Sequence, residues 1–296
     1  MRHVFQIIIS LFLSLSCSTY CFSKSGYITV TAGGKIFYEE QGKGEPLILL
    51  HGHSLDHRMW NLQFDEFARY YRTIRLDFRG YGRSSEQPES FQFCHVDDLI
   101  TLMDSLNISR AHVVGLSMGA FIAGDILAMY PERLLSCTLA SGSIRGSLGP
   151  SMPMDTKEHA KREKEIEQLL ARGVDNMKKE WLETLVKGGG SKRHTMRKPL
   201  QRMIEDWTAW QPLNKEARLY YGKDAWKMLE ERQPDVPVLM LRGKLEGKGK
   251  KTREERFLKN FRLKELPDCG HMMNMERPDL FNHAVLDFLQ SMQKHQ

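Results

Sequence analysis

Residues 112–121 read HVVGLSMGAF, and this stretch decides the fold. Two valines end a short apolar run, Ser117 stands between Gly115 and Gly119, and small and apolar residues follow. The run before the serine predicts a buried strand and the run after it predicts a helix, so the serine lies in a sharp turn. Glycine on either side lets neighbouring backbone approach such a turn closely. We expect an exposed Ser117 hydroxyl at a helix N-terminus, where negative charge is stabilised.

Short apolar strands alternate with helical segments on both sides of this turn. Strand-like runs are YITV (27–30), KIFYEEQG (35–42), PLILLHG (46–52), TIRLDF (73–78) and RLLSCTLASG (133–142). Helical spacing marks WNLQFDEFARYY (60–71) and HVDDLITLMDSL (95–106). This alternation predicts an α/β fold, with a mostly parallel central sheet flanked by helices on both faces.

The alternation stops at about residue 144. Residues 144–233 are helical in pattern and strongly charged, and strands return with VPVLMLRG (236–243) and FRLKELPDCG (261–270). We therefore expect a core at 24–143 and 234–296, and a helical lid at 144–233 inserted between late strands. Tryptophans of this segment either line an apolar substrate pocket or pack within the lid, and the pattern favours neither; they are Trp181, Trp207, Trp210 and Trp226.

Residues 1–23 differ in kind from the rest. A positive start precedes an apolar, uncharged run that is too short for a membrane span, and small residues follow. This pattern is typical of a cleavable signal peptide and predicts an exported protein, periplasmic or secreted. Cys17 at the end of the run leaves an alternative open, in which a lipid attached to this cysteine anchors the protein to the membrane.

Composition and charge exclude several classes of protein. The 296 residues carry a formal net charge of +6, but basic and acidic residues are mixed along the chain. The basic runs 191–194 and 248–251 lack interleaved aromatic residues, so they predict solvated loops and no nucleic-acid partner. Cys94, Cys137 and Cys269 lack metal-type spacing. We expect no metal and no cofactor, and the oligomeric state is not predicted.

A serine hydroxyl attacks a carbonyl carbon only when a base accepts its proton and a further group orients the base. The best candidate base is His271, which follows a late strand directly and is preceded by Gly270. The candidate acid is Glu246, in the loop after residues 236–243. Asp235 lies at the wrong end of that strand, and Glu254 is expected on the solvated face of the following helix.

Two backbone N–H groups are expected to bind the developing oxyanion. One belongs to Met118, directly after the serine, and the other to His53 in the loop HGHS that follows residues 46–50. The side chain of His53 is expected to face the pocket. We expect His51 to brace the loop and His57 to lie on the surface.

These motifs together resemble those of lid-bearing serine hydrolases of the α/β-hydrolase fold. The resemblance covers residues 27–293 and rests on HGHS (51–54), DFRGYGRS (77–84), GLSMG (115–119), RGKLE (242–246) and GHMMNMERP (270–278). It implies Ser117 as nucleophile, His271 as base, Glu246 as acid, oxyanion donors at His53 and Met118, and structural roles for Asp77 and Arg79. The chain departs from the family pattern in having glutamate where aspartate is usual, and in His53 where an aromatic residue is commoner.

Serine, base and oxyanion donors predict acyl transfer to water through an acyl-enzyme. We expect a small-molecule carboxylic ester or lactone as the substrate. Aspartate at position 117 would have indicated dehalogenation or epoxide opening, and serine there argues against both. Alternatives that stay open are a C–C bond hydrolase, an aminopeptidase that holds a substrate amine with Glu205 or Asp206, and a ligand-binding protein with residual hydrolysis.

Overall fold

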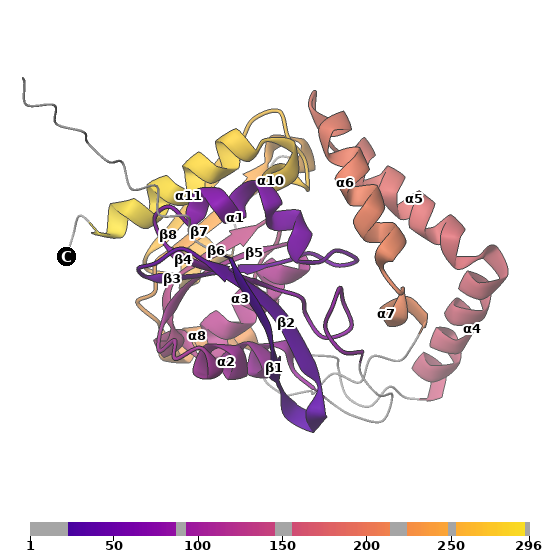
Figure 1. Cartoon of the computed structure of the whole chain (residues 1–296), viewed down its shortest axis with the longest axis horizontal. Helices are drawn as coiled ribbons and strands as arrows, with labels where there is room; N and C mark the ends of the chain where they lie inside the picture. The colour runs from indigo at the N-terminus through magenta and orange to yellow at the C-terminus, as the bar shows by residue number, and fades with distance from the viewer. Residues whose placement is uncertain (1–22, 87–92, 146–155, 214–223, 248–252, 294–296) are drawn as a thin grey trace, which may run out of the picture.

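The computed structural model describes residues 23–86, 93–145, 156–213, 224–247 and 253–293, and these ranges contain one eight-stranded sheet (Figure 1). The strands lie side by side in the order β1-β2-β4-β3-β5-β6-β7-β8. Their bounds are β1 (Lys24–Thr29), β2 (Lys35–Gln41), β3 (Pro46–Leu50), β4 (Arg72–Leu76), β5 (Ala111–Leu116), β6 (Leu134–Ala140), β7 (Val238–Gly243) and β8 (Phe261–Leu266).

The directions of the strands determine at which edge of the sheet the loops meet. β2 runs antiparallel to both β1 and β4, and every neighbouring pair from β4 to β8 is parallel. The carboxyl ends of β3 to β8 therefore lie at one edge of the sheet. All six residues of β5 are buried, as expected for a central parallel strand covered on both faces. The predicted mostly parallel sheet is confirmed.

Helices cover both faces of the sheet (Figure 1). One face carries α1 (Asn61–Phe67), α10 (Met273–Glu276) and α11 (Pro278–Gln293), and the other carries α2 (His95–Ser105), α3 (Met118–Met129) and α8 (Ala225–Arg232). A short helix, α9 (Glu254–Phe257), precedes β8. Pro278 is the first residue of α11. At this position the fixed φ of proline suits a helix, and the backbone N–H that proline lacks would have no acceptor within the helix.

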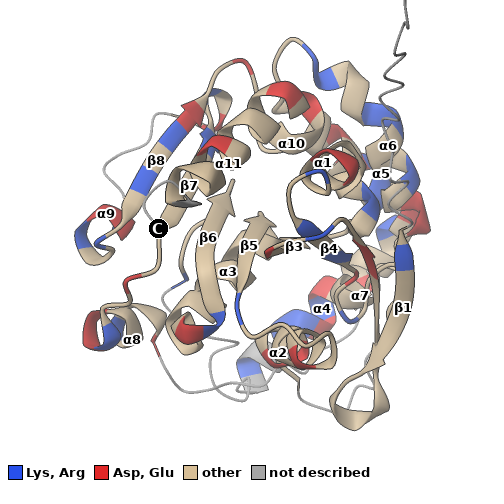
Figure 2. Ribbon diagram, turned by 60° about the vertical axis from the view of Figure 1, so that its left-hand side comes forward, with Lys and Arg blue, Asp and Glu red and all other residues tan. Residues whose placement is uncertain are grey.

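The described residues between β6 and β7 form helices joined by turns and loops, and none of them forms a strand. Before α8 come α4 (Thr156–Arg172), α5 (Val174–Lys187), α6 (Arg193–Asp206) and α7 (Trp210–Leu213), and these four stand together to one side of the sheet (Figure 1). We call α4–α7 the helical insertion. By contrast, α8 packs against α3 of the core. Basic and acidic residues share the same helices, as on α5 and α8 (Figure 2).

One expectation for the core was wrong. Glu254 does not lie on a solvated helix face: it is buried, and its Oε1 accepts the backbone N–H of Ile144 at 3.1 Å. The carboxylate supplies an acceptor to the chain that leaves β6, because this backbone segment has left the sheet and lost its strand partners.

Several other expectations lie outside the described residues. These include residues 1–22 of the predicted signal peptide, with the candidate lipid site Cys17, and the basic run 248–251.

Within the described residues, Cys94, Cys137 and Cys269 are present as free thiols. Among the helices of the described ranges, none combines the length and the apolar character that a membrane span requires.

Candidate active site

Ser117 occupies a strained turn between β5 and α3. Its backbone has φ 56° and ψ −113°, a combination rare for a side chain-bearing residue and characteristic of functional sites. A Cβ atom on Gly115 would lie 2.1 Å from the carbonyl oxygen of Gly119, and one on Gly119 would lie 2.1 Å from that of Leu50. Only glycine fits at either position, which confirms the expected close approach of neighbouring backbone.

Two predicted residues, His271 and Glu246, are directly hydrogen-bonded. Nδ1–H of His271 donates to Oε1 of Glu246 at 2.8 Å, which leaves Nε2 as the nitrogen that can accept a proton. The other carboxylate oxygen, Oε2, accepts the Ser141 hydroxyl at 2.9 Å and the Gly243 N–H at 3.1 Å. Burial alone would raise the pKa of Glu246, but the hydrogen bonds from His271 and Ser141 outweigh it and hold that pKa below its usual value.

The strand order brings Ser117 to the same edge as this pair. Ser117 follows β5, Glu246 follows β7 and His271 follows β8. In the sheet, β6 lies between β5 and β7, and β8 lies next to β7. The N–H of Ser117 donates to the carbonyl of Ala140 at 2.9 Å, and the next residue, Ser141, contacts His271. Within the described residues no hydrogen bond joins the Ser117 hydroxyl to the His271 ring. Such bonds often tighten only when substrate is bound.

Sequence reasoning missed Ser141. It lies at the end of β6, and its hydroxyl reaches both Glu246 and, at 2.8 Å, the carbonyl oxygen of His271. Its φ of 46° places it in the left-handed region. The sequence signal that could have indicated Ser141 is its position directly after β6, which lies between the strands that precede Ser117 and Glu246.

The expected oxyanion donors lie on either side of Ser117. Met118 is the first residue of α3, where a backbone N–H has no acceptor within the helix. On the other side, a Cβ atom on Gly52 would lie 3.6 Å from Cβ of Ser117, so the loop that continues into His53 passes beside the serine. Both expected donors therefore belong to segments that adjoin Ser117.

Aromatic rings surround the His53 side chain. Its Nδ1 lies 2.8 Å from the Tyr81 hydroxyl, and its ring meets those of Trp207 and Trp181 edge-on, with centroids 5.1 Å and 6.3 Å apart. Trp181 also donates its indole N–H to the Ser54 hydroxyl at 2.6 Å. These two tryptophans of the insertion therefore contact the HGHS loop (residues 51–54).

The other two tryptophans of the segment 144–233 make different contacts. Trp226, in α8, packs against Phe257 and beneath the guanidinium of Arg253, with ring centroids 5.6 Å apart in the Phe257 pair. Trp210 is buried at the start of α7. Trp226 belongs to the same buried cluster as residues of α3, so it packs against the core and not within the insertion.

His51 braces the HGHS loop. Its Nδ1–H donates to the carbonyl of Gly52 at 2.8 Å, and its Nε2 accepts the N–H of Phe78 at 3.0 Å. Burial lowers the pKa of His51. A neutral ring is required here, because only the neutral form can both donate and accept.

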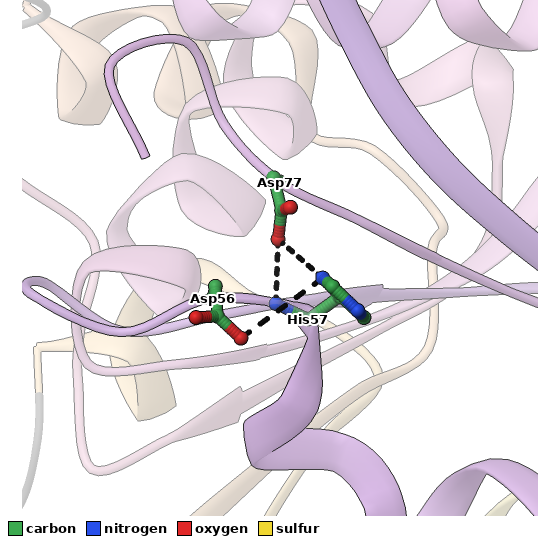
Figure 3. Close-up of side chains that lie close together, drawn as sticks. All are labelled: Asp56, His57 and Asp77. Atoms are coloured by element: carbon green, nitrogen blue, oxygen red, sulfur yellow. Dashed lines mark hydrogen bonds and ion pairs between the residues drawn. The ribbon is translucent and has the colours of Figure 1, made fainter. Parts of the chain in front are cut away.

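The expectation that His57 lies on the surface was wrong. The side chain is buried, and both its backbone N–H and its Nδ1–H donate to Oδ1 of Asp77, at 2.7 Å and 2.8 Å (Figure 3). Asp77 follows β4, the strand next to β3, so the two loops meet at the edge of the sheet. Arg79, from the same loop as Asp77, forms a buried ion pair with Asp98 at 2.6 Å.

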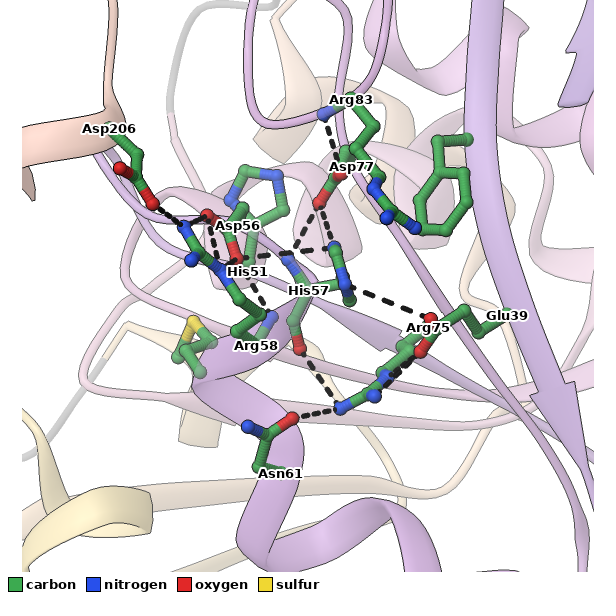
Figure 4. A network of polar contacts seen from close by, with 12 residues as sticks. Glu39, His51, Asp56, His57, Arg58, Asn61, Arg75, Asp77, Arg83 and Asp206 are labelled. Atoms are coloured by element: carbon green, nitrogen blue, oxygen red, sulfur yellow. Dashed lines mark hydrogen bonds and ion pairs between the residues drawn. The ribbon is translucent and has the colours of Figure 1, made fainter. Parts of the chain in front are cut away.

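Asp56, His57 and Asp77 place potential metal-ligand atoms within 4.8 Å of one another (Figure 3). The donor set nevertheless favours a hydrogen-bonded network. Both oxygens of Asp56 accept hydrogen bonds from Arg58, and Oδ2 of Asp77 accepts the N–H of Arg83 at 2.8 Å (Figure 4). A metal ion would have to displace the Arg58 guanidinium, so we assign no metal to this cluster.

The same network joins the insertion to the core (Figure 4). One nitrogen of Arg58, Nη2, lies 2.6 Å from Asp56 and 2.8 Å from Asp206 at the end of α6. A cleft of about 360 Å³ opens beside it. Asp206 is thus paired with an arginine, which weakens its candidacy as an amine-binding residue.

A comparison with family models matches residues 47–284 to the alpha/beta hydrolase family. The chain belongs to this family. The match spans most of the chain and includes the turn of Ser117, the acid loop and the His271 loop.

Similar proteins differ in the activities for which they are named. A Mycobacterium tuberculosis protein that carries the name of a non-heme bromoperoxidase, BpoC, is 29% identical over 86% of this chain and 97% of its own length. Bifunctional epoxide hydrolase 2 of Sus scrofa is 23% identical over 90% of this chain and 55% of its own. The crystal structure of the enol-lactonase from Burkholderia xenovorans LB400 superposes with a TM-score of 0.68 at 22% identity, covering 90% of this chain and all of that one. These likenesses establish a hydrolase fold and leave the substrate open.

Proposed function

We propose that the protein is a serine hydrolase that cleaves a carboxylic ester or lactone through an acyl-enzyme on Ser117. The observation that carries the proposal is the hydrogen bond from His271 to Glu246, at the edge of the sheet where the strained turn of Ser117 ends β5. Glu246 orients the ring with Nε2 as the acceptor, and the same carboxylate stabilises the imidazolium that forms.

The proposed reaction has two halves. Nε2 of His271 accepts the Ser117 proton while Oγ attacks the carbonyl carbon, and the tetrahedral oxyanion is bound by the N–H groups of Met118 and His53. The imidazolium then gives its proton to the leaving alcohol oxygen. Water repeats the sequence on the acyl-enzyme and releases the acid.

The identity of the nucleophile supports this chemistry over epoxide opening. Attack of a serine oxygen on an epoxide would leave an ether, which has no carbonyl for water to attack, and the enzyme would be consumed. Serine acylated by an ester or lactone keeps a carbonyl, and the same base can direct water to it. The enol-lactonase of similar fold is consistent with this substrate class.

The discriminating experiment compares wild type with Ser117→Ala on a panel of p-nitrophenyl esters, lactones and thioesters. We expect turnover by wild type and loss of at least about a thousandfold in the variant. If neither protein turned over any compound of the panel but wild type still bound one of them, a binding protein would be favoured. Turnover restricted to a vinylogous diketone or to an aminoacyl amide would favour a C–C bond hydrolase or an aminopeptidase.

We also propose that the protein acts after export, because residues 1–23 have the pattern of a signal peptide. Fractionation of expressing cells, with N-terminal sequencing of the mature chain, tests this. Retention in the membrane that is abolished by Cys17→Ser would instead support the lipid anchor.

A further inference from the structure

The turn between α5 and α6 packs directly against the loop that carries His271. This turn, Gly188–Ser191, contains three consecutive glycines. A Cβ atom on Gly270 would lie 2.1 Å from the carbonyl oxygen of Gly188, and one on Gly190 would lie 2.5 Å from that of Asp268. Backbone lies on backbone here, and no side chain separates the insertion from the histidine loop.

A buried carboxylate joins the two segments. Glu276 is 1% exposed, its Oε1 accepts the N–H of Gly190, and its Oε2 accepts the N–H of Gly270 at 3.0 Å. Removing a carboxylate from water is unfavourable unless hydrogen bonds replace the lost hydration. Glu276 obtains them from two elements far apart in sequence, and one donor is the residue directly before His271.

A second pair of hydrogen bonds strengthens the contact. Both the backbone N–H and the hydroxyl of Ser191 donate to the carboxylate of Asp268, the N–H at 2.9 Å. The loop of His271 also meets the core at Ser141, whose hydroxyl oxygen lies 2.8 Å from the carbonyl oxygen of His271. The loop therefore contacts both the core and the insertion.

We propose that Gly190 and Ser191, acting through Glu276 and Asp268, form a positioning element for His271. The inference rests on the proposed function, in which the ring of His271 must meet both Ser117 and Glu246. A base displaced by about an ångström loses much of its effect on rate. The same contacts join the α5–α6 end of the insertion to the loop of His271.

Gly188 and Gly190, two glycines of the same turn, provide a matched test. A methyl group at Gly190 must wedge the turn away from Asp268, whereas at Gly188 it meets only the carbonyl oxygen of Thr184, at an ordinary 3.8 Å. We expect Gly190→Ala to lower kcat at least about tenfold with KM unchanged, and Gly188→Ala to match wild type. Circular dichroism and melting curves select conditions in which both variants are folded.

Other outcomes overturn the proposal. A Gly190→Ala enzyme with unchanged kcat and a raised KM would mean that the turn shapes the substrate pocket and does not position the base. Equal activity in all three proteins would mean that the contact is structural only.

A measurement independent of turnover separates this inference from the proposed function. The ring ¹⁵N resonances of His271, assigned with His271→Gln, should change in Gly190→Ala and in Glu276→Gln but not in Gly188→Ala. If wild type proves inactive but these resonances respond as expected, the proposed function fails and the positioning contact stands. Unchanged resonances in both folded variants would overturn the contact whatever the activity.

Discussion

The Ser141 hydroxyl lies 2.9 Å from Oε2 of Glu246 and 2.8 Å from the carbonyl oxygen of His271, so one side chain contacts both the proposed acid and the proposed base. A hydroxyl has one proton and donates to one acceptor at a time, and the charged carboxylate is the stronger acceptor. Ser141 also has a φ of 46°, in the region that favours glycine. Two variants can therefore separate the hydroxyl from the backbone conformation.

We predict that Ser141→Ala and Ser141→Gly both lower kcat by about tenfold, because each removes a hydrogen bond to a charged group. Glycine relieves the backbone strain and alanine does not, so only the alanine variant should melt at a lower temperature. Steady-state kinetics and thermal melts of both proteins test this. Wild-type kcat in the glycine variant would show that the hydroxyl has no part in catalysis.

Glu246→Gln should lower kcat by about 10³- to 10⁴-fold in a protein that still folds. The amide keeps the size of the side chain but removes the negative charge that faces Nδ1–H of His271 and stabilises the imidazolium. Glu255→Gln, at an exposed position close in sequence, serves as the control and should behave as wild type. A near-wild-type rate for Glu246→Gln would assign the acid role to another carboxylate.

The sequence predicted those features that local pattern determines. The strand, turn and helix around Ser117 are contiguous in sequence, and the loops of Glu246 and His271 follow β7 and β8. Because parallel strands all end at one edge, the contact between His271 and Glu246 followed from the predicted topology without knowledge of side-chain packing.

Residues whose partners depend on the order of strands were not predictable in this way. His57 reads as a surface residue in its own loop, and its buried partner Asp77 follows a different strand. Glu254 reads as solvated in its helix, yet it bonds to Ile144, which is 110 positions away. The contact of Glu276 with Gly190 likewise depends on how the insertion folds back.

Arg58→Met should destabilise the fold by about 1–3 kcal/mol, because it leaves the buried carboxylate of Asp56 without its cation. Asp206→Asn removes only the exposed partner of the same arginine and should change the free energy of unfolding by less than about 1 kcal/mol. Urea unfolding of both variants gives the two values. Equal losses would show that the bond between insertion and core, and not the burial of Asp56, determines stability here.

Acid stability should depend on Asp77. Burial alone would raise the pKa of Asp77, but the hydrogen bonds from His57 and the N–H of Arg83 outweigh it and hold that pKa below its ordinary value of about 4. The ionised carboxylate therefore contributes stability above pH ~4, and this contribution is lost as pH falls through the lower pKa of the folded state.

Asp77→Asn removes this titration from the folded protein. We expect the variant to be less stable than wild type at neutral pH, and its free energy of unfolding to fall less steeply below pH ~4. Urea unfolding from neutral pH down to pH ~3 measures both slopes. Asp65→Asn, at an exposed position, is the control and should follow the wild-type slope. Parallel curves for Asp77→Asn and wild type would mean that His57 and the Arg83 N–H do not depress the pKa of Asp77, and that the acid sensitivity originates in other carboxylates.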